Sequence, residues 1–302
     1  MSADDERAAT VALLRTGRRP WVEYSELLEQ HGGALAALEH ELSDRTVGRS
    51  AQTSLLPEAA PDMNELLDQA RADLVGWDAG GMRLVTVLDP DYPPNLRAVH
   101  DRPPMVFMAG RLTPADARGV AVVGARRATD AGLQTATNFA RHLATSGYTV
   151  ISGLAAGIDT AAHTGALAQK GRTVAVIGTG LARAYPPANE PLQRRIANEC
   201  AVISQFWPDS PPSRRSFPMR NAVMSGVALA TVVVEASETS GARMQARLAL
   251  AQGRPVFLLA SLTRHQPWAR DCAARPGTRV ISDPAEVTTA LERLIASDPL
   301  LA

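Results

Sequence analysis

Two short turns rich in small residues follow two apolar runs in the middle of the chain, and their residue types suit phosphate binding. The run 120–123 ends in GARR, and the run 148–151 ends in SGLAAG. A turn of this kind that opens a helix directs free backbone N–H groups at an anion. Alternatively, the glycines only permit tight turns. The candidate phosphate contacts are Gly124, Arg126, Arg127, Ser152, Gly153 and Gly157.

A later segment, residues 204–226, interleaves aromatic rings with arginines in the proline-rich string SQFWPDSPPSRRSFPMRNAVMSG. Single-stranded nucleic acid needs such a mixture, because ring faces stack on bases and guanidinium groups pair with phosphates. Phe206 and Trp207 could instead form an apolar lid on the sheet. The candidate contacts of this segment are Arg214, Arg215, Phe217, Arg220 and Asn221.

A third loop begins like a dinucleotide-binding fingerprint but does not complete it. Gly178 and Gly180 have the first GxG spacing, and Arg183 stands where the third glycine belongs. No acidic residue ends the strand before the SGLAAG turn to bind a ribose, which argues against an NAD enzyme. Gly178 and Gly180 remain candidate phosphate contacts. Tyr185, which caps this loop, either stacks on a base or packs under the turn.

The residues with catalytic chemistry do not form a complete motif. Asp159 and His163 lie one helical turn apart, which predicts a hydrogen bond that stabilises the helix or anchors its loop rather than a general base. Glu235 ends an apolar strand, with Ser240 and Gly241 beyond it, and either orients a base or a ribose or caps the following helix. Walker A, HExxH and serine-elbow motifs are absent. We therefore expect a non-enzymatic protein with no metal and no cofactor.

The elements that must position these residues alternate between strand and helix. Apolar runs predict strands at 119–124, 148–152, 173–178, 201–204, 230–235 and 255–259, separated by helices at 131–146, 158–170, 189–199, 219–228 and 241–252, and followed by a strand at 279–281 and a helix at 284–295. This order predicts an α/β fold with a doubly wound, mostly parallel, Rossmann-like sheet. Ligands of such sheets bind at the carboxyl ends of the strands, near the point where the strand order reverses.

The residues before this sheet have a different character. We expect a small helical domain over 1–45, a linker over 46–62 rich in Ser, Thr, Pro and Ala, an extension over 63–117, and the Rossmann-like domain over 118–297. Short helices are expected at 7–14, 24–30 and 34–42 of the helical domain. Within the extension, residues 63–77 predict a helix and residues 83–87 a strand. The prolines that follow favour extended chain with turns.

Charge is divided unevenly along the chain, although the 302 residues carry no net charge. Residues 1–110 contain 10 arginines and 18 acidic residues, and residues 111–302 contain 21 basic and 13 acidic residues. The basic part suits an anionic ligand, and the acidic part suits a partner contact or repulsion from DNA, although unequal solvated faces would give the same numbers. The sequence has no apolar run of about 20 residues, no signal-peptide pattern and only two cysteines, so we expect a soluble cytoplasmic protein.

Six strings in this sequence resemble the DNA-processing protein A family (DprA, also called Smf) in order and spacing: VAVVGARRAT, SGLAAGIDTAAHTGAL, GTGLARAYPPAN, FPMRN, VVVEASETSGA and ARLALAQGRPVF. The resemblance covers about residues 10–295. It implies a Rossmann-like core that binds single-stranded DNA, forms a homodimer, and protects incoming DNA and loads the RecA recombinase in competent bacteria. The DNA pocket that it implies would use Gly124, Arg126, Ser152, Gly153, Gly157, Phe217, Arg220 and Asn221.

The sequence departs from the family pattern at three places. Ala222 follows Asn221 where the family has arginine, and Ser204-Gln205 replaces Ser-Glu. The family's Pro-Gly and Ser-x-Gly after the sixth strand are replaced by LLASLTRHQPWARDCAARPGTRVIS, residues 258–282. We expect no C-terminal winged helix, which some members carry. Two alternatives stay open: a nucleotide hydrolase like the phosphoribohydrolases, whose PGGxGTxxE motif is missing here, and a sensor of a small signalling nucleotide.

Overall fold

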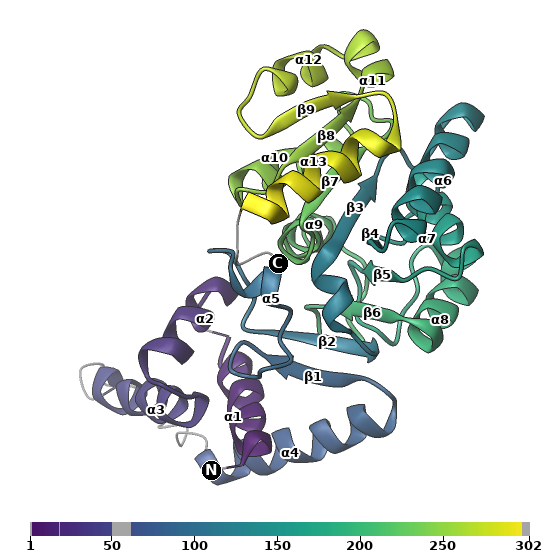
Figure 1. The fold of residues 1–302 in the computed structure, drawn as a ribbon. Coiled ribbons are helices and arrows are strands. Elements are labelled where there is room, and N and C mark those ends of the chain that lie inside the picture. Colours follow the sequence, from purple (N-terminus) through teal and green to yellow (C-terminus); the bar gives the residue numbers. More distant parts are fainter. Residues whose placement is uncertain (1, 18, 50–61, 298–302) are drawn as a thin grey trace. The chain divides into compact units, whose positions relative to one another are not determined.

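The computed structural model describes residues 2–17, 19–49 and 62–297, which divide into two compact units. The first unit comprises Met1–Tyr92 and Asp101–Met108, and the second comprises Pro93–His100 and Ala109–Ala302. This division differs from the predicted boundaries at 45, 62 and 117, since most of the predicted extension joins the N-terminal helices. Figure 1 labels the elements of both units.

The first unit consists of helices and a pair of antiparallel strands. Its helices are α1 (Ala3–Arg15), α2 (Trp21–Gln30), α3 (Ala34–Arg49) and α4 (Met63–Ala79), and β1 (Arg83–Thr86) pairs antiparallel with β2 (Met105–Gly110). Helix α1 starts four residues before the predicted start at Arg7, because Ser2 and Asp5 form a capping box.

Helix α4 belongs to this unit because it packs on α1. Ion pairs join the two helices, between Arg71 and Asp5 at 2.9 Å and between Arg15 and Asp73 at 2.6 Å. Helix α3 continues to Arg49 and so enters the predicted linker. Residues 50–61 of that linker lie outside the described residues.

The second unit contains the predicted doubly wound sheet. Its strands lie in the order β6-β5-β4-β3-β7-β8-β9, and each neighbouring pair is parallel. The fold class predicted from the sequence is confirmed. The observed bounds are β3 (Gly119–Val123), β4 (Thr149–Ser152), β5 (Thr173–Val176), β6 (Ala201–Ser204), β7 (Ala230–Val233), β8 (Val256–Leu259) and β9 (Thr278–Ile281).

The strand order reverses beside β3. From β3 the chain runs outward through β4, β5 and β6, and it then returns to place β7 on the other side of β3. Val120 accordingly pairs with Val150 of β4 and with Ala230 of β7. The crevice between the carboxyl ends of β3 and β7 is therefore the switch point at which this class of sheet binds ligands.

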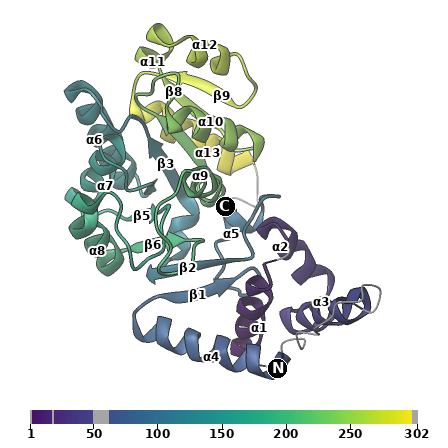
Figure 2. The same ribbon diagram turned by 180° about the vertical axis from the view of Figure 1, so that it is seen from behind.

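Helices cover both faces of the sheet because β–α–β crossovers are right-handed. Figures 1 and 2 show α6 (Asp130–Thr145), α7 (Ile158–Ala168) and α8 (Glu190–Glu199) side by side along the sheet. Helix α13 (Pro284–Ser297) packs on α6, whereas α9 (Ser216–Val227) and α10 (Gly241–Ala251) pack on each other. The remaining short helices are α5 (Pro94–Arg97), η1 (Pro114–Arg118), η2 (Pro187–Asn189), α11 (Ala260–His265) and α12 (Pro267–Ala273).

Across residues 2–17, 19–49 and 62–297, no helix combines the length and the apolar character needed to cross a membrane.

Candidate nucleic-acid interface

The two small-residue turns interlock at the switch point. The Ile158 N–H donates to the Ala125 carbonyl at 3.2 Å. A Cβ on Gly124 would lie 2.5 Å from Ile158 Cγ1, and one on Gly157, whose φ is +78°, would lie 2.4 Å from the Ala125 oxygen. The packing of one turn on the other thus requires glycine at both positions, whatever the ligand.

Asp159 anchors the second turn from below. Its carboxylate accepts from the Gly153 N–H at 3.1 Å and from the Ala155 N–H at 3.4 Å, and its side chain is buried. Burial raises the pKa of this carboxyl, and Arg220 and the N–H donors oppose the rise. The carboxylate therefore fixes the loop, one of the two roles that the sequence suggested.

The predicted hydrogen bond between Asp159 and His163 is wrong. His163 Nδ1 lies 2.7 Å from Thr173 Oγ1 of strand β5, because helix α7 packs on the sheet and directs the imidazole toward it. The Asp159 carboxylate is held instead by the N–H groups of the second turn. Burial lowers the pKa of this imidazole to about 3, with Arg220 contributing in the same direction. His163 is a neutral packing residue.

Ser152 and Gly153 also serve the fold. The Ser152 hydroxyl is fully buried and donates to the Val122 carbonyl at 2.7 Å, which ties β4 to β3. A Cβ on Gly153 would lie 1.4 Å from Arg220 Nη1, so glycine is needed there to admit the arginine. The hydroxyl predicted to cradle phosphate is thus already used inside the sheet.

Arg220 is a buried cation beneath the turns. It is 5% exposed, and its Nη1 donates to the Val176 carbonyl at 3.0 Å. Burial lowers its pKa, Asp159 raises it, and Arg126 lowers it. Its Nε has no hydrogen-bond partner among the described residues. We call Ser152, Gly153, Asp159 and Arg220 the floor of the site.

Three side chains form a row above this floor, in which Arg126 and Tyr185 are exposed and Phe217 between them is half-buried. The Arg126 guanidinium lies 4.9 Å from the centre of the Phe217 ring, and the Tyr185 ring lies 5.5 Å from the same ring. Tyr185 is 39% exposed, so it contacts Phe217 without being covered by the loop. Gly178 makes room for Phe217, because a Cβ there would lie 2.9 Å from the ring. We call Arg126, Phe217 and Tyr185 the ridge.

Other predicted contacts lie apart from the ridge. Gly180 is buried, and a Cβ there would lie 2.1 Å from the carbonyl oxygens of Trp207 and Pro208. It therefore positions the loop 207–210 and does not face solvent. Arg214 and Arg215 are exposed in the turn before α9, but neither lines a pocket described below.

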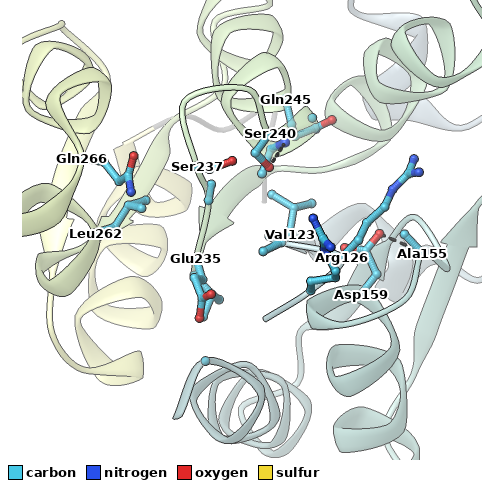
Figure 3. A pocket seen from close by; sticks show the side chains of 18 of the residues that line it. Val123, Arg126, Ala155, Asp159, Glu235, Ser237, Ser240, Gln245, Leu262 and Gln266 are labelled. Carbon is cyan, nitrogen blue, oxygen red and sulfur yellow. Dashed lines mark hydrogen bonds between the residues drawn. The ribbon is translucent and has the colours of Figure 1, made fainter. Parts of the chain in front are cut away.

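Two pockets meet at the ridge. The larger, of about 1030 Å³, opens at the switch point between the ends of β3 and β7, and the smaller, of about 180 Å³, lies between the second turn and Tyr185. Figure 3 shows the larger pocket, with Arg126 and Ala155 on one side and Leu262 and Gln266 opposite. The residues that line both pockets are Arg126, Ala155, Phe217 and Arg220.

Glu235 caps a different helix from the one that the sequence suggested. Its carboxylate accepts from the Thr129 N–H at 3.2 Å and from the Thr129 hydroxyl at 2.8 Å, and that hydroxyl accepts from Gly132 N at 3.0 Å at the start of α6. The following helix α10 is capped instead by Ser240, which accepts from Ala242 N. The correction follows from the sheet order, which sets the end of β7 beside the β3 turn.

Asn221, Gly241 and Arg127 join the larger pocket. The Asn221 amide donates to the Gly241 carbonyl at 3.3 Å, so these two residues fix the start of α10. Arg127 is exposed and lines the pocket next to Arg126.

Sequence reasoning missed one wall of the larger pocket. Ser261, Leu262 and His265 of α11, with Gln266, line it from the segment after β8. This segment held no recognised motif, and its two helices were not predicted. The rule that ligands bind beyond the carboxyl ends of strands would have found it if applied to the strand predicted at 255–259.

The sheet, its switch point and the interlocked turns define a Rossmann-like α/β protein. Residues 83–297 match the family of DNA recombination-mediator protein A, and the chain belongs to this family. It is 38% identical to the protein Smf of Synechocystis over 219 residues, which cover 71% of this chain and 54% of that protein. It is 38% identical to the DNA processing protein DprA of Streptococcus pneumoniae over 174 residues, which cover 58% of this chain and 61% of that protein.

The chain thus spans between half and two thirds of these two relatives. Solved structures give the same picture of the fold. DNA processing protein A of Streptococcus pneumoniae aligns with a TM-score of 0.63 at 28% identity, covering 81% of this chain and 89% of that one. DNA processing protein A of Helicobacter pylori, whose structure concerns its single-stranded DNA binding mode, aligns with a TM-score of 0.62 at 24% identity, over 70% and 96% of the chains.

Proposed function

We propose that this protein binds single-stranded DNA at the ridge and the smaller pocket, in DNA uptake or recombination. The observation that carries the proposal is the ridge, in which an exposed guanidinium group and an exposed tyrosine ring both lie against the half-buried ring of Phe217. A backbone phosphate pairs with Arg126, and an unstacked base stacks on Tyr185 or enters the pocket beside it. Family membership supports the same ligand.

Charge near the ridge favours a polyanion. Arg214 and Arg215 are exposed in the turn just before Phe217 and helix α9, and Arg127 is exposed beside Arg126. Phosphate contacts of this kind release counterions, so the affinity for DNA falls as salt rises. The floor contributes indirectly, since Asp159 holds the second turn, which is hydrogen-bonded to the turn that carries Arg126.

The test is a titration of labelled oligo-dT by fluorescence anisotropy at two salt concentrations. We expect Arg126→Ala to weaken binding about tenfold and to reduce the salt slope by about one contact. Arg247→Ala removes the same charge from an exposed position on α10 that lines neither pocket, and it should bind as the parent does. If both variants bind like the parent, the ridge is not the DNA site.

The proposal includes three further expectations that family membership supports. The protein forms a homodimer, delivers DNA to the RecA recombinase, and works in the cytoplasm, where the buried Cys200 and Cys272 stay free thiols. Analytical ultracentrifugation tests the dimer. RecA filament assembly on DNA coated with single-strand binding protein tests the delivery: a rate unchanged by this protein would overturn it.

We also propose that the protein acts by binding and not by catalysis. Glu235, a carboxylate at the switch point, is held by Thr129 at the start of α6, and the hydrolase motif PGGxGTxxE is missing from the sequence. Incubation with nucleoside monophosphates should release no free base. Release that is abolished in Glu235→Gln would instead establish a hydrolase.

A further inference from the structure

We propose that Asn189 is a positioning residue for single-stranded DNA. It ties the second turn, residues 152–157, to the Tyr185 loop, residues 178–188, and so keeps the smaller pocket between them shaped for one unstacked base. The inference rests on the proposed DNA binding and adds a residue that contacts no ligand itself. Asn189 is 9% exposed and lines neither pocket, so any effect on DNA must pass through the residues that it contacts.

The side chain of Asn189 is directed away from its own helix. Asn189 occupies the N-cap of α8, where an asparagine ordinarily accepts from the first N–H groups of the helix that it precedes. Its side chain makes no such bond in the described part of the chain. The amide Nδ2 donates instead to the Leu154 carbonyl at 2.8 Å and to Thr160 Oγ1 at 2.9 Å. The amide therefore stabilises the second turn and the start of α7.

Leu154 is the residue of that turn which most needs support. Its φ is +56°, a conformation that residues with a Cβ rarely adopt because the Cβ crowds the following carbonyl. Such a conformation persists only where the surrounding structure holds it. The Leu154 side chain is fully buried, and Asn189 binds its carbonyl. The Thr160 hydroxyl, which also accepts from Asn189, donates to the next carbonyl, that of Ala155, at 2.8 Å.

The backbone of Asn189 binds the opposite wall of the smaller pocket. Its N–H donates to the Pro186 carbonyl at 2.9 Å and closes the short turn that follows Tyr185. Tyr185 and Pro186 line the pocket on this side, and Ala155 and Ala156 line it on the side of the second turn. One residue thus joins both walls, through its main chain and its side chain. The pocket of about 180 Å³ is smaller than a site for a drug-sized ligand, so a small change in wall spacing decides whether a flat base fits.

The test replaces the amide by a shorter group that can still cap α8. Asn189→Ser retains a capping hydroxyl, but the side chain is too short to reach the Leu154 carbonyl. We expect it to weaken oligo-dT about fivefold, because the stacked base loses its fitted pocket, and to leave the salt slope unchanged, because Arg126 still meets the phosphate. Fluorescence anisotropy at two salt concentrations measures both.

An abasic oligonucleotide of the same length separates positioning from a general loss of structure. It has the phosphates of oligo-dT and no bases, so Asn189→Ser and the parent should bind it alike. A variant that is merely misfolded would lose both ligands. Thr160→Val removes the hydroxyl at the other end of the link and should show the same pattern, which keeps the test open if Asn189→Ser does not fold.

Two further variants complete the comparison. Asn198→Ser makes the same replacement at an exposed position near the end of α8 and should bind as the parent does. The double variant Asn189→Ser, Tyr185→Ala should lose no more oligo-dT affinity than Tyr185→Ala alone, because both changes act on one pocket.

Three results would overturn the inference while DNA binding itself stands. In the first, Asn189→Ser binds oligo-dT as tightly as the parent. In the second, it loses the abasic oligonucleotide to the same extent as oligo-dT. In the third, its loss multiplies with that of Tyr185→Ala, so the two residues act independently. Failure of the proposed function has a different signature: the parent and Arg126→Ala bind alike, and the role of Asn189 then falls with it.

Discussion

The floor and the ridge each contain an arginine that the sequence assigned to phosphate binding, Arg220 and Arg126. Arg220 is 5% exposed and its guanidinium donates to a carbonyl of β5, whereas Arg126 is exposed and rests on an aromatic ring. The floor therefore determines the shape of the turns, and the ridge is available to a ligand. Candidate ligand contacts of the same residue type therefore differ in role: Arg220 stabilises the fold beneath the turns, and Arg126 is the one that a ligand can reach.

The largest expected effect tests whether the floor is structural. Gly153→Ala places a Cβ against Arg220 Nη1, which must move away from the Val176 carbonyl. Overpacking and the loss of a charged hydrogen bond should lower the free energy of unfolding by about 3 kcal/mol, measured in urea.

The matched control for this variant is another glycine replaced by alanine. Gly76 lies inside α4 with open space around it, so Gly76→Ala should leave the free energy of unfolding unchanged or raise it by up to about 1 kcal/mol. A loss below about 0.5 kcal/mol in Gly153→Ala would mean that Arg220 is free to move, and the contrast between floor and ridge would fail.

The second effect is a loss of stability at acidic pH, which is caused by the buried imidazole of His163 beside the floor. His163 has a folded pKa of about 3 against the ordinary value of 6.5, so below pH 6.5 the unfolded chain binds a proton that the folded chain does not. The free energy of unfolding therefore decreases as the pH is lowered below 6.5, by about 1.4 kcal/mol per pH unit, or about 2 kcal/mol between pH 6.5 and 5.

Asp159 acts in the opposite direction, because its raised pKa lets the folded state take up a proton first as the pH falls. His163→Asn retains Asp159, so the difference between the pH profiles of the two proteins isolates the imidazole. Urea unfolding at several pH values measures both. Parallel profiles would contradict the buried neutral histidine.

The smallest effect belongs to the ridge and concerns binding alone. Tyr185→Ala should weaken oligo-dT about fivefold, since stacking of a base on an aromatic ring contributes at least about 1 kcal/mol. Tyr185→Phe keeps the ring and should bind as the parent does. Neither change should alter the free energy of unfolding by more than about 0.5 kcal/mol, because the side chain is exposed.

The elements of the sheet could be predicted because their signals are local. The runs at 119–124 and 201–204 are apolar throughout and are bounded by small or polar residues, and the observed strands β3 and β6 lie within one residue of them. The N-terminal helices were placed less well. The capping box at Ser2 was overlooked, and the packing of α4 on α1 depends on residues far apart in the chain.

The sequence could predict that the candidate residues lie together at the ends of the strands, but it could not predict which partner each side chain contacts. Arg220 binds a carbonyl 44 residues earlier, and Glu235 binds a backbone N–H 106 residues earlier, so their partners depend on the completed sheet. The wall formed by α11 was missed for the same reason, since its residues resemble no known motif and only the sheet brings them to the pocket.

The interlocked turns have a consequence for engineering. The contacts of Gly124 with Ile158 and of Gly157 with Ala125 mean that neither loop can be lengthened or transplanted alone. A graft that moves the ridge to another scaffold must carry residues 123–130 and 152–159 together, with the strand spacing between them preserved. In a library of variants, we expect substitutions in one loop to be tolerated only together with matching substitutions in the other loop.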